Sequence, residues 1–286
     1  MANLLNTHPR VFVSHEADTA WLLYQHRDGV PRRVEPHPLD SDMMLRQTAR
    51  IGRRTLRRTL GGGADTESVR AAFYDIERRL MERWVRGQRR PGGGLRRTIK
   101  EVGKRPTPRR LWRALRRERQ VLDKDFEGLA WVGDKKHAQM LDPGVRGFLT
   151  AHFPDARSVH VVRDPRGAVA SMQRAADEWW VKPDSFGGTA EDVLAAWAEV
   201  EERVLAAKEQ EAAPILTVRL EDLAADPHAE MARVFDFLDL DLVPVVERWI
   251  PQLVWQTDPN RKHGDVPLPD VPRARAVMER YGYDVA

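Results

Sequence analysis

The chain has 286 residues, 42% hydrophobic and 31% charged, with a formal net charge of +4 at pH 7. This length suffices for a large buried core, and we expect a single domain over residues 1–286. The absence of cysteine excludes disulfides, thiolate zinc sites and a cysteine nucleophile. Because the sequence has neither a secretory signal nor an apolar run of membrane-spanning length, we expect a cytoplasmic protein.

Positive charge is concentrated in one part of the chain, which we interpret as a basic helical insertion over residues 39–120. Between Arg46 and Gln120 there are 24 Lys and Arg against 7 Asp and Glu, whereas the rest of the chain has 23 against 36. The insertion is either a solvated surface that offsets the acidic remainder or a platform for an anionic acceptor or membrane surface. Nucleic acid is disfavoured, because aromatic residues are sparse there and no nucleic-acid-reading motif is present.

The first residues predict the end of a helix followed by a strand. Residues 1–7, MANLLNT, have the apolar spacing of an amphipathic helix, and residues 10–14, RVFVS, are typical of a strand. Glu16 comes just after this strand, so we expect it at the carboxyl end. A solvated loop acid is the alternative.

Two helix starts are predicted within the basic insertion. Thr66 is expected to cap a helix that runs to about Arg86, and Thr107 with Pro108 begins a second helix. The glycines at 61–63 could cradle a phosphate in principle, but no Gly-Lys-Ser/Thr comes after them and no strand precedes them. We therefore interpret them as a hinge or loop.

An alternating strand and helix pattern begins after the insertion. Residues 129–132 predict a short strand that ends in the segment GDKKH, and Pro143 opens a helix to about His152. This places Lys135 and His137 at a second strand end. The sequence leaves open whether His137 is structural or catalytic.

Residues 158–172, SVHVVRDPRGAVASM, are the segment with the clearest chemical meaning. They predict a strand, a turn at 164–167 and a helix from Ala168. Arg163 then lies at a strand's carboxyl end facing a helix N-terminus, where exposed N–H groups and the helix dipole favour an anion. Arg163 and Ser171 can converge on one phosphate; an ordinary buried strand–turn–helix unit is the alternative.

The remainder continues the same alternation. We predict a helix over 190–209 with a buried stripe, a strand over 214–219, a helix opened by Asp226 and Pro227, and a last helix from about Pro269. The stripe consists of Leu194, Trp197, Val200, Val204 and Leu205. This alternation predicts an α/β fold with a central parallel sheet flanked by helices.

Taken together, the segments from about Trp131 to Tyr283 resemble the sulfotransferase family that uses 3′-phosphoadenosine 5′-phosphosulfate (PAPS). The segment at 158–172 resembles the family's 3′-phosphate-binding segment, and GDKKH resembles the preceding strand end. TVRLEDLAADP with FLDLDL, and the closing RYGY, also match the family in the right order. The resemblance implies a P-loop NTPase-like α/β fold and PAPS as the co-substrate.

One part of the family pattern is missing. The 5′-phosphosulfate loop, Pro-Lys/Arg-Ser-Gly-Thr-Thr, does not occur in the chain, whereas LLNTHPRVFVSHE resembles the segment after that loop in the tyrosylprotein branch. We therefore expect that Met1 is an internal methionine and that the domain is N-terminally incomplete. A catalytically inactive, sulfotransferase-like nucleotide-binding or scaffold protein is the alternative.

The resemblance also implies roles for individual residues. Arg163 and Ser171 match the ligands of the 3′-phosphate, and Lys135 matches the lysine at the transferring sulfuryl group or its leaving oxygen. Glu16 matches the general base of one branch and His137 that of another, so the choice between them stays open.

The remaining implications concern the late basic loop and the substrates. Arg261 and Lys262 would stand in for the family's late phosphate ligands. The acceptor would be the hydroxyl or amine of a small molecule, saccharide or glycolipid. Sulfate carries less charge than phosphate, so we expect no metal requirement.

Overall fold

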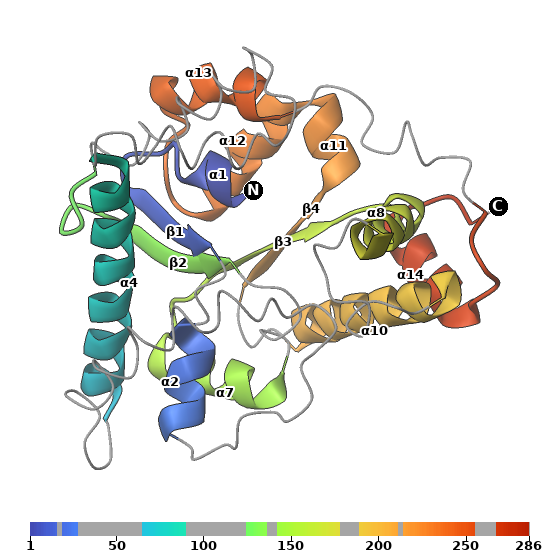
Figure 1. Cartoon of the computed structure of the whole chain (residues 1–286), viewed down its shortest axis with the longest axis horizontal. Coiled ribbons are helices and arrows are strands. Elements are labelled where there is room, and N and C mark those ends of the chain that lie inside the picture. Colours follow the sequence, from blue (N-terminus) through green and yellow to red (C-terminus); the bar gives the residue numbers. More distant parts are fainter. Residues whose placement is uncertain are drawn as a thin grey trace. The chain divides into compact units, whose positions relative to one another are not determined.

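The computed structural model describes residues 1–15, 19–27, 65–89, 124–135, 142–177, 189–210, 214–254 and 267–285. Their helices and strands group into two units, each built on a pair of parallel strands (Figure 1). Unit 1 contains α1 (Ala2–Leu5), β1 (Val11–His15), α2 (Thr19–Arg27), α4 (Thr66–Arg89), β2 (Trp131–Lys135) and α13 (Pro244–Leu253). Unit 2 contains α7 (Pro143–His152), β3 (Ser158–Val162), α8 (Pro165–Asp177), α10 (Ala190–Glu209), β4 (Ile215–Arg219), α11 (Leu220–Ala225), α12 (Pro227–Phe237) and α14 (Pro272–Tyr281).

In unit 1, β1 and β2 pair in parallel, from Val11 opposite Trp131 to His15 opposite Lys135. Helix α4 packs against both strands and against α2. The apolar contact between strand and helix is made by Phe12 and Met81, with partly buried Val132 packed against them. Burial of these side chains supplies the free energy that holds a highly charged helix on the sheet.

The strand predicted at 129–132 lies further toward the C-terminus in the structure, where β2 spans Trp131–Lys135. Gly133, Asp134 and Lys135 belong to β2, because they pair with Val13, Ser14 and His15 of β1. Gly and Asp are poor strand formers, and backbone pairing with a buried neighbouring strand overrides that preference. Lys135 is therefore the last residue of the strand rather than part of the next loop.

Helix α4 is the described part of the basic insertion. The predicted cap at Thr66 is wrong by one residue: the helix includes Thr66 and reaches Arg89, and the capping side chain is Asp65, whose carboxylate accepts a hydrogen bond from the Ser68 backbone N–H at 2.8 Å. Asp65 precedes the first helical residue, which is the position where a side-chain oxygen can reach the unpaired N–H groups of the first turn. The glycines at 61–63 and the helix start at Thr107 lie outside the described residues.

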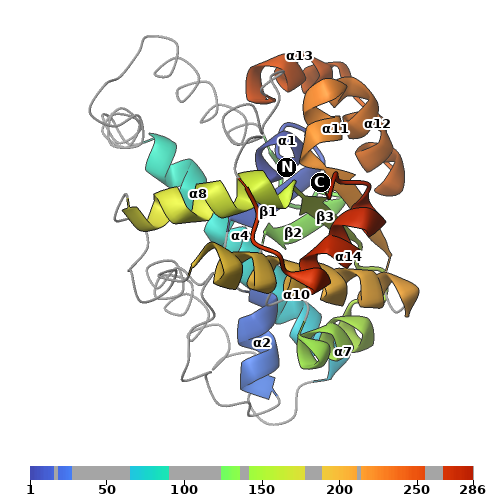
Figure 2. The same cartoon turned by 90° about the vertical axis from the view of Figure 1, so that its right-hand side faces the viewer.

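In unit 2, β3 and β4 pair in parallel, from Ser158 opposite Ile215 to Val162 opposite Arg219. Helix α10 packs against α8 and α14 (Figure 2). Their apolar side chains form one buried cluster that includes Val169, Leu194 and Val277. Both strands and their parallel pairing agree with the prediction. A single central sheet that joins the two strand pairs stays a prediction.

The turn predicted at 164–167 is wrong in one respect: helix α8 begins at Pro165, three residues before Ala168. The Asp164 carboxylate accepts a hydrogen bond from the Arg166 backbone N–H at 2.8 Å. Pro165 has no N–H to lose in the first turn and its fixed φ suits a helix start. An Asp-Pro pair after a strand is thus a helix start here rather than a separate turn.

Helix α10 has the bounds that the sequence predicts, Ala190–Glu209. Thr189 and Asp192 form a capping box at its start. In the predicted stripe, Leu194, Val204 and Leu205 are buried, whereas Trp197 and Val200 are partly buried. Helices α2, α11 and α13 were not predicted. Within the described ranges, no helix is long and apolar enough to cross a membrane.

Candidate functional site

The described residues include three of the seven predicted site residues. Lys135 ends β2 in unit 1, and Arg163 and Ser171 lie on the β3–α8 segment of unit 2. The other four predicted site residues, Glu16, His137, Arg261 and Lys262, lie outside the described residues. Lys135 belongs to unit 1 and Arg163 and Ser171 belong to unit 2, so the strand ends of each unit are described separately.

In unit 2, Arg163 comes directly after β3 and is partly exposed, and Ser171 is exposed on α8. The strand register places Val162 opposite Arg219, so the two neighbouring strands end side by side. Ser171 lies three and four residues after Ala168 and Gly167, on the same face of the helix as these first-turn residues. The positions of Arg163 and Ser171 are compatible with the predicted phosphate site.

Backbone donors at this turn are bonded by carboxylates of the chain itself. The Arg166 N–H donates to Asp164 Oδ1, and the Asp164 N–H donates to Glu221 Oε1 at 3.0 Å. An anion would have to displace these oxygens to use the same N–H groups. The prediction of a phosphate here therefore depends on the side chains of Arg163 and Ser171 rather than on these two backbone donors.

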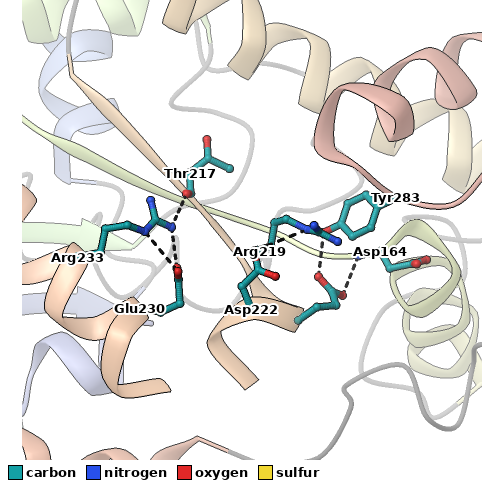
Figure 3. A network of polar contacts seen from close by, with 8 residues as sticks. Asp164, Thr217, Arg219, Asp222, Glu230, Arg233 and Tyr283 are labelled. Atoms are coloured by element: carbon teal, nitrogen blue, oxygen red, sulfur yellow. Dashed lines mark hydrogen bonds and ion pairs between the residues drawn. The ribbon is translucent and has the colours of Figure 1, made fainter. Parts of the chain in front are cut away.

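Glu221, which is not among the predicted site residues, links three segments at the ends of β3 and β4. Figure 3 labels its partners Asp164 and Tyr283. While Oε1 accepts from the Asp164 N–H, Oε2 accepts from the Tyr283 hydroxyl at 2.9 Å. The Arg219 guanidinium lies over the Tyr283 ring, 4.5 Å from its centroid. Burial, and next the negative charge of Glu221, raise the pKa of Tyr283, so the hydroxyl keeps its proton and donates.

The C-terminal segment is fixed on this strand end by backbone contacts as well. Arg166 Nη1 donates to the carbonyl oxygen of Asp284 at 3.0 Å. Gly282 ends α14 with φ of 70°, a left-handed conformation that is easily reached only without a Cβ, and the Tyr283 N–H returns to the Met278 carbonyl. The predicted RYGY ending thus places Tyr283 against Glu221.

A separate ion pair, between Arg233 and Glu230, supports β4, the strand that precedes Glu221. Arg233 of α12 donates to Glu230 at 2.6 Å and to the Thr217 carbonyl oxygen at 3.0 Å (Figure 3). These bonds join α12 to β4 and fix the strand that ends at Arg219.

In unit 1, the strand ends carry a buried polar network. Asp134 Oδ2 accepts from the Thr19 backbone N–H at 3.1 Å, and Asp134 Oδ1 accepts from the Ser14 hydroxyl at 3.4 Å. The Thr19 hydroxyl donates to Glu77 Oε1 at 2.5 Å. The network therefore joins β1, β2, the start of α2 and the middle of α4, directly beside Lys135.

Glu77 has an unusual environment for a carboxyl group. It is fully buried, and its Oε2 has no hydrogen-bond partner among the described residues. Burial, and next the negative charge of Asp134, raise the pKa of Glu77 to about 8, although the hydroxyls of Thr19 and Ser14 act in the opposite direction. At neutral pH Glu77 is therefore mainly the neutral acid.

The sequence did contain a signal for Glu77. It lies four residues after Phe73 and eight after Val69, both buried, so helical spacing places it on the apolar face of α4. The abundance of charged residues in this helix concealed that position. For Glu221 the signal was an acid two residues after the strand that ends at Arg219.

The solved structures that are similar to this chain include two sulfotransferase domains. The first is a sulfotransferase domain from the curacin biosynthetic pathway, with 14% identity and a TM-score of 0.47 over 100% of this chain and 94% of that chain. The second is a sulfotransferase domain from the olefin synthase of Synechococcus PCC 7002, with 17% identity and a TM-score of 0.47 over 96% of this chain and 94% of that chain. No curated protein matches the chain at a significant level.

A family model described as the sulfotransferase family matches residues 1–244, most of the chain. The matched part includes β1, β2, β3 and β4 and therefore both sets of strand ends. The sequence, with its ordered segments around Arg163 and Lys135, and the family match lead to the same result: this chain belongs to the sulfotransferase family, whose members transfer sulfuryl groups.

Proposed function

We propose that this chain transfers a sulfuryl group from PAPS to a hydroxyl or amine of an acceptor. The observation that carries the proposal is the position of Arg163, a cation placed directly after a parallel strand and before a helix N-terminus, in a chain of the sulfotransferase family. Ligands of open α/β folds bind at such strand ends.

In this proposal the nucleotide is held by its 3′-phosphate. The Arg163 guanidinium forms a planar pair of hydrogen bonds to the phosphate, and the Ser171 hydroxyl donates a further one. Glu221 fixes the turn between Arg163 and Ser171, because its carboxylate accepts a hydrogen bond from the backbone N–H of Asp164, the residue next to Arg163. Arg261 and Lys262 are proposed as additional cations for the nucleotide phosphates.

The reaction is an in-line displacement at sulfur. A bond forms between the acceptor oxygen or nitrogen and sulfur, the bond from sulfur to the 5′-phosphate oxygen breaks, and 3′-phosphoadenosine 5′-phosphate leaves. Lys135 stabilises the charge that develops on the leaving oxygen. Glu16 or His137 takes the proton of the acceptor as general base.

The acceptor is proposed to be a small molecule, a saccharide or a glycolipid. If residues 39–120 form the basic surface that their composition indicates, an acceptor with negative charge is attracted to it. The Michaelis constant of such an acceptor then rises with ionic strength, whereas that of a neutral acceptor does not.

The nucleotide site can be tested by calorimetry with two ligands that differ in one phosphate. Wild type should bind 3′-phosphoadenosine 5′-phosphate more tightly than adenosine 5′-monophosphate. Arg163→Ala should weaken binding of the first ligand by about 30-fold to 150-fold, about 2 to 3 kcal/mol, because charge-assisted hydrogen bonds to the 3′-phosphate are lost. It should leave the second ligand unaffected.

Arg275→Ala is the matched control, since Arg275 is exposed in unit 2 and pairs with Asp270. Equal weakening of both ligands by Arg163→Ala would contradict a 3′-phosphate contact. Sulfuryl transfer is then measured as release of 3′-phosphoadenosine 5′-phosphate from PAPS with a panel of hydroxyl and amine acceptors. Nucleotide binding without any transfer would favour the binding or scaffold protein.

A further inference from the structure

Glu77 is a fully buried ionisable group that the proposed chemistry does not use. It belongs to α4, yet its hydrogen bond is with the Thr19 hydroxyl at the start of α2, and the Thr19 backbone N–H in turn donates to Asp134 of β2. Asp134, which bonds the Thr19 N–H, is adjacent in sequence to Lys135. The carboxyl group of Glu77 on α4 therefore lies near the end of β2, where Lys135 is the last residue.

The surroundings of Glu77 favour its neutral form. One carboxyl oxygen has a hydroxyl partner and the other has none among the described residues. Asp134 is the charged group that acts on it within the described part of the chain, and it is also an acid. Two carboxylates in one buried network repel each other, so a proton on Glu77 removes the repulsion.

We propose that Glu77 is a positioning residue, which in its protonated form joins α4 to the start of α2 and keeps the strand end that carries Lys135 in place. The proposal rests on the proposed function only where it concerns Lys135. Loss of the proton puts a second negative charge beside Asp134, and the network between α4, α2 and β2 opens. The negative charge of ionised Glu77 also acts against the positive charge of Lys135, which the anionic sulfuryl donor requires.

This assignment predicts how the site responds to pH. Below pH 8 the acid is mainly protonated and the network is closed, and above it the acid ionises. In wild type, kcat/KM for sulfuryl transfer should fall about tenfold per pH unit above about pH 8, as for loss of one essential proton. In Glu77→Gln, whose amide cannot ionise, this fall should be absent.

The experiment compares wild type, Glu77→Gln and Glu82→Gln between pH 6 and pH 9.5. Glu82 is exposed on the same helix, so its variant has the same chemical change without the buried contacts and should keep the wild-type profile. A Glu77→Gln profile that falls as wild type does would overturn the proposal. A merely structural role would change activity at every pH by the same factor.

A second measurement does not depend on transfer or on a variant. In wild type, the amide resonance of Thr19 is followed by NMR through the same pH range, together with side-chain carboxyl resonances of 13C-labelled glutamate. We expect the Thr19 amide to shift with a midpoint near pH 8, in step with one glutamate carboxyl. A Thr19 amide that does not show this midpoint would overturn the proposal, whereas absent transfer with a normal titration would overturn only the proposed function.

Discussion

At the ends of β1 and β2 the structure buries a carboxyl group beside another acid, whereas at the ends of β3 and β4 it surrounds a carboxyl group with donors. Glu77 has one hydroxyl partner and lies near Asp134. Glu221 accepts hydrogen bonds from a backbone N–H and from the Tyr283 hydroxyl, and Arg219 lies over the same tyrosine.

The difference shows how the environment assigns a role to the same side chain. A fully buried acid with few donors is held neutral, so it adds no charge to its strand end and responds to pH near 8. An acid that satisfies two donors fixes a turn instead, and it does so beside the arginine predicted to bind phosphate. Unit 1 is therefore expected to be sensitive to pH and unit 2 to loss of a hydrogen-bond acceptor.

The largest effect is expected for the pH dependence of stability. The folded-state pKa of Glu77 is raised from 4.5 to about 8, so its contribution to stability is fully present below about pH 4.5 and is lost as pH rises toward 8. The free energy of unfolding of wild type should fall by about 1.4 kcal/mol per pH unit across this window because of this group. In Glu77→Gln this contribution should be absent.

Urea unfolding at pH 5, 6, 7, 8 and 9 measures the effect, and the difference between wild type and Glu77→Gln isolates Glu77 from other titrating groups. Glu82→Gln serves as the control, because an exposed carboxyl should leave the wild-type slope unchanged. If the free energy of unfolding changed with pH in parallel for wild type and Glu77→Gln, ionisation of Glu77 would not be what distinguishes the two sets of strand ends.

An intermediate effect is expected for Glu221→Ala in unit 2. The substitution leaves the Asp164 N–H and the Tyr283 hydroxyl without their acceptor, which should lower the free energy of unfolding by about 2 to 4 kcal/mol. Binding of 3′-phosphoadenosine 5′-phosphate should also weaken, since the turn after Arg163 loses its support. Chemical unfolding and calorimetry measure the two effects.

Glu279→Ala is the matched control for Glu221→Ala, because Glu279 is exposed on α14 and its bond to the Gly282 N–H is made by the backbone. We expect it to change stability by less than about 0.5 kcal/mol. If Glu221→Ala lowered the free energy of unfolding no more than this control, the two hydrogen bonds of Glu221 would not be what stabilises the ends of β3 and β4.

The smallest effect is expected for Tyr283→Phe. The variant removes the hydroxyl that donates to Glu221 but keeps the ring under Arg219, so it should cost about 1 kcal/mol. Thermal unfolding is compared with that of Tyr74→Phe, in which the tyrosine is exposed. If Tyr283→Phe lowered the free energy of unfolding as much as Glu221→Ala does, the hydrogen bond from the Tyr283 hydroxyl, rather than the one from the Asp164 N–H, would account for most of the contribution of Glu221.

Much of the local structure could be predicted from neighbouring residues. Helix α10 and helix α7 have the predicted bounds, because apolar spacing and capping residues act within a few positions of the chain. The boundaries that moved, at Asp164 and at Lys135, depend on a cap and on a partner strand. A strand end is fixed by its pairing partner, which a single segment does not contain.

By itself the sequence determined the alternation of strands and helices, the position of Arg163 after a strand and the resemblance to sulfotransferases, since these depend on local spacing and motif order. Only the tertiary structure decided which acids meet at the strand ends. Glu77 is 57 residues from Asp134, and Glu221 is 62 residues from Tyr283. Burial and hydrogen-bond partners, which set the charge and role of a carboxyl group, arise only when such distant segments fold together.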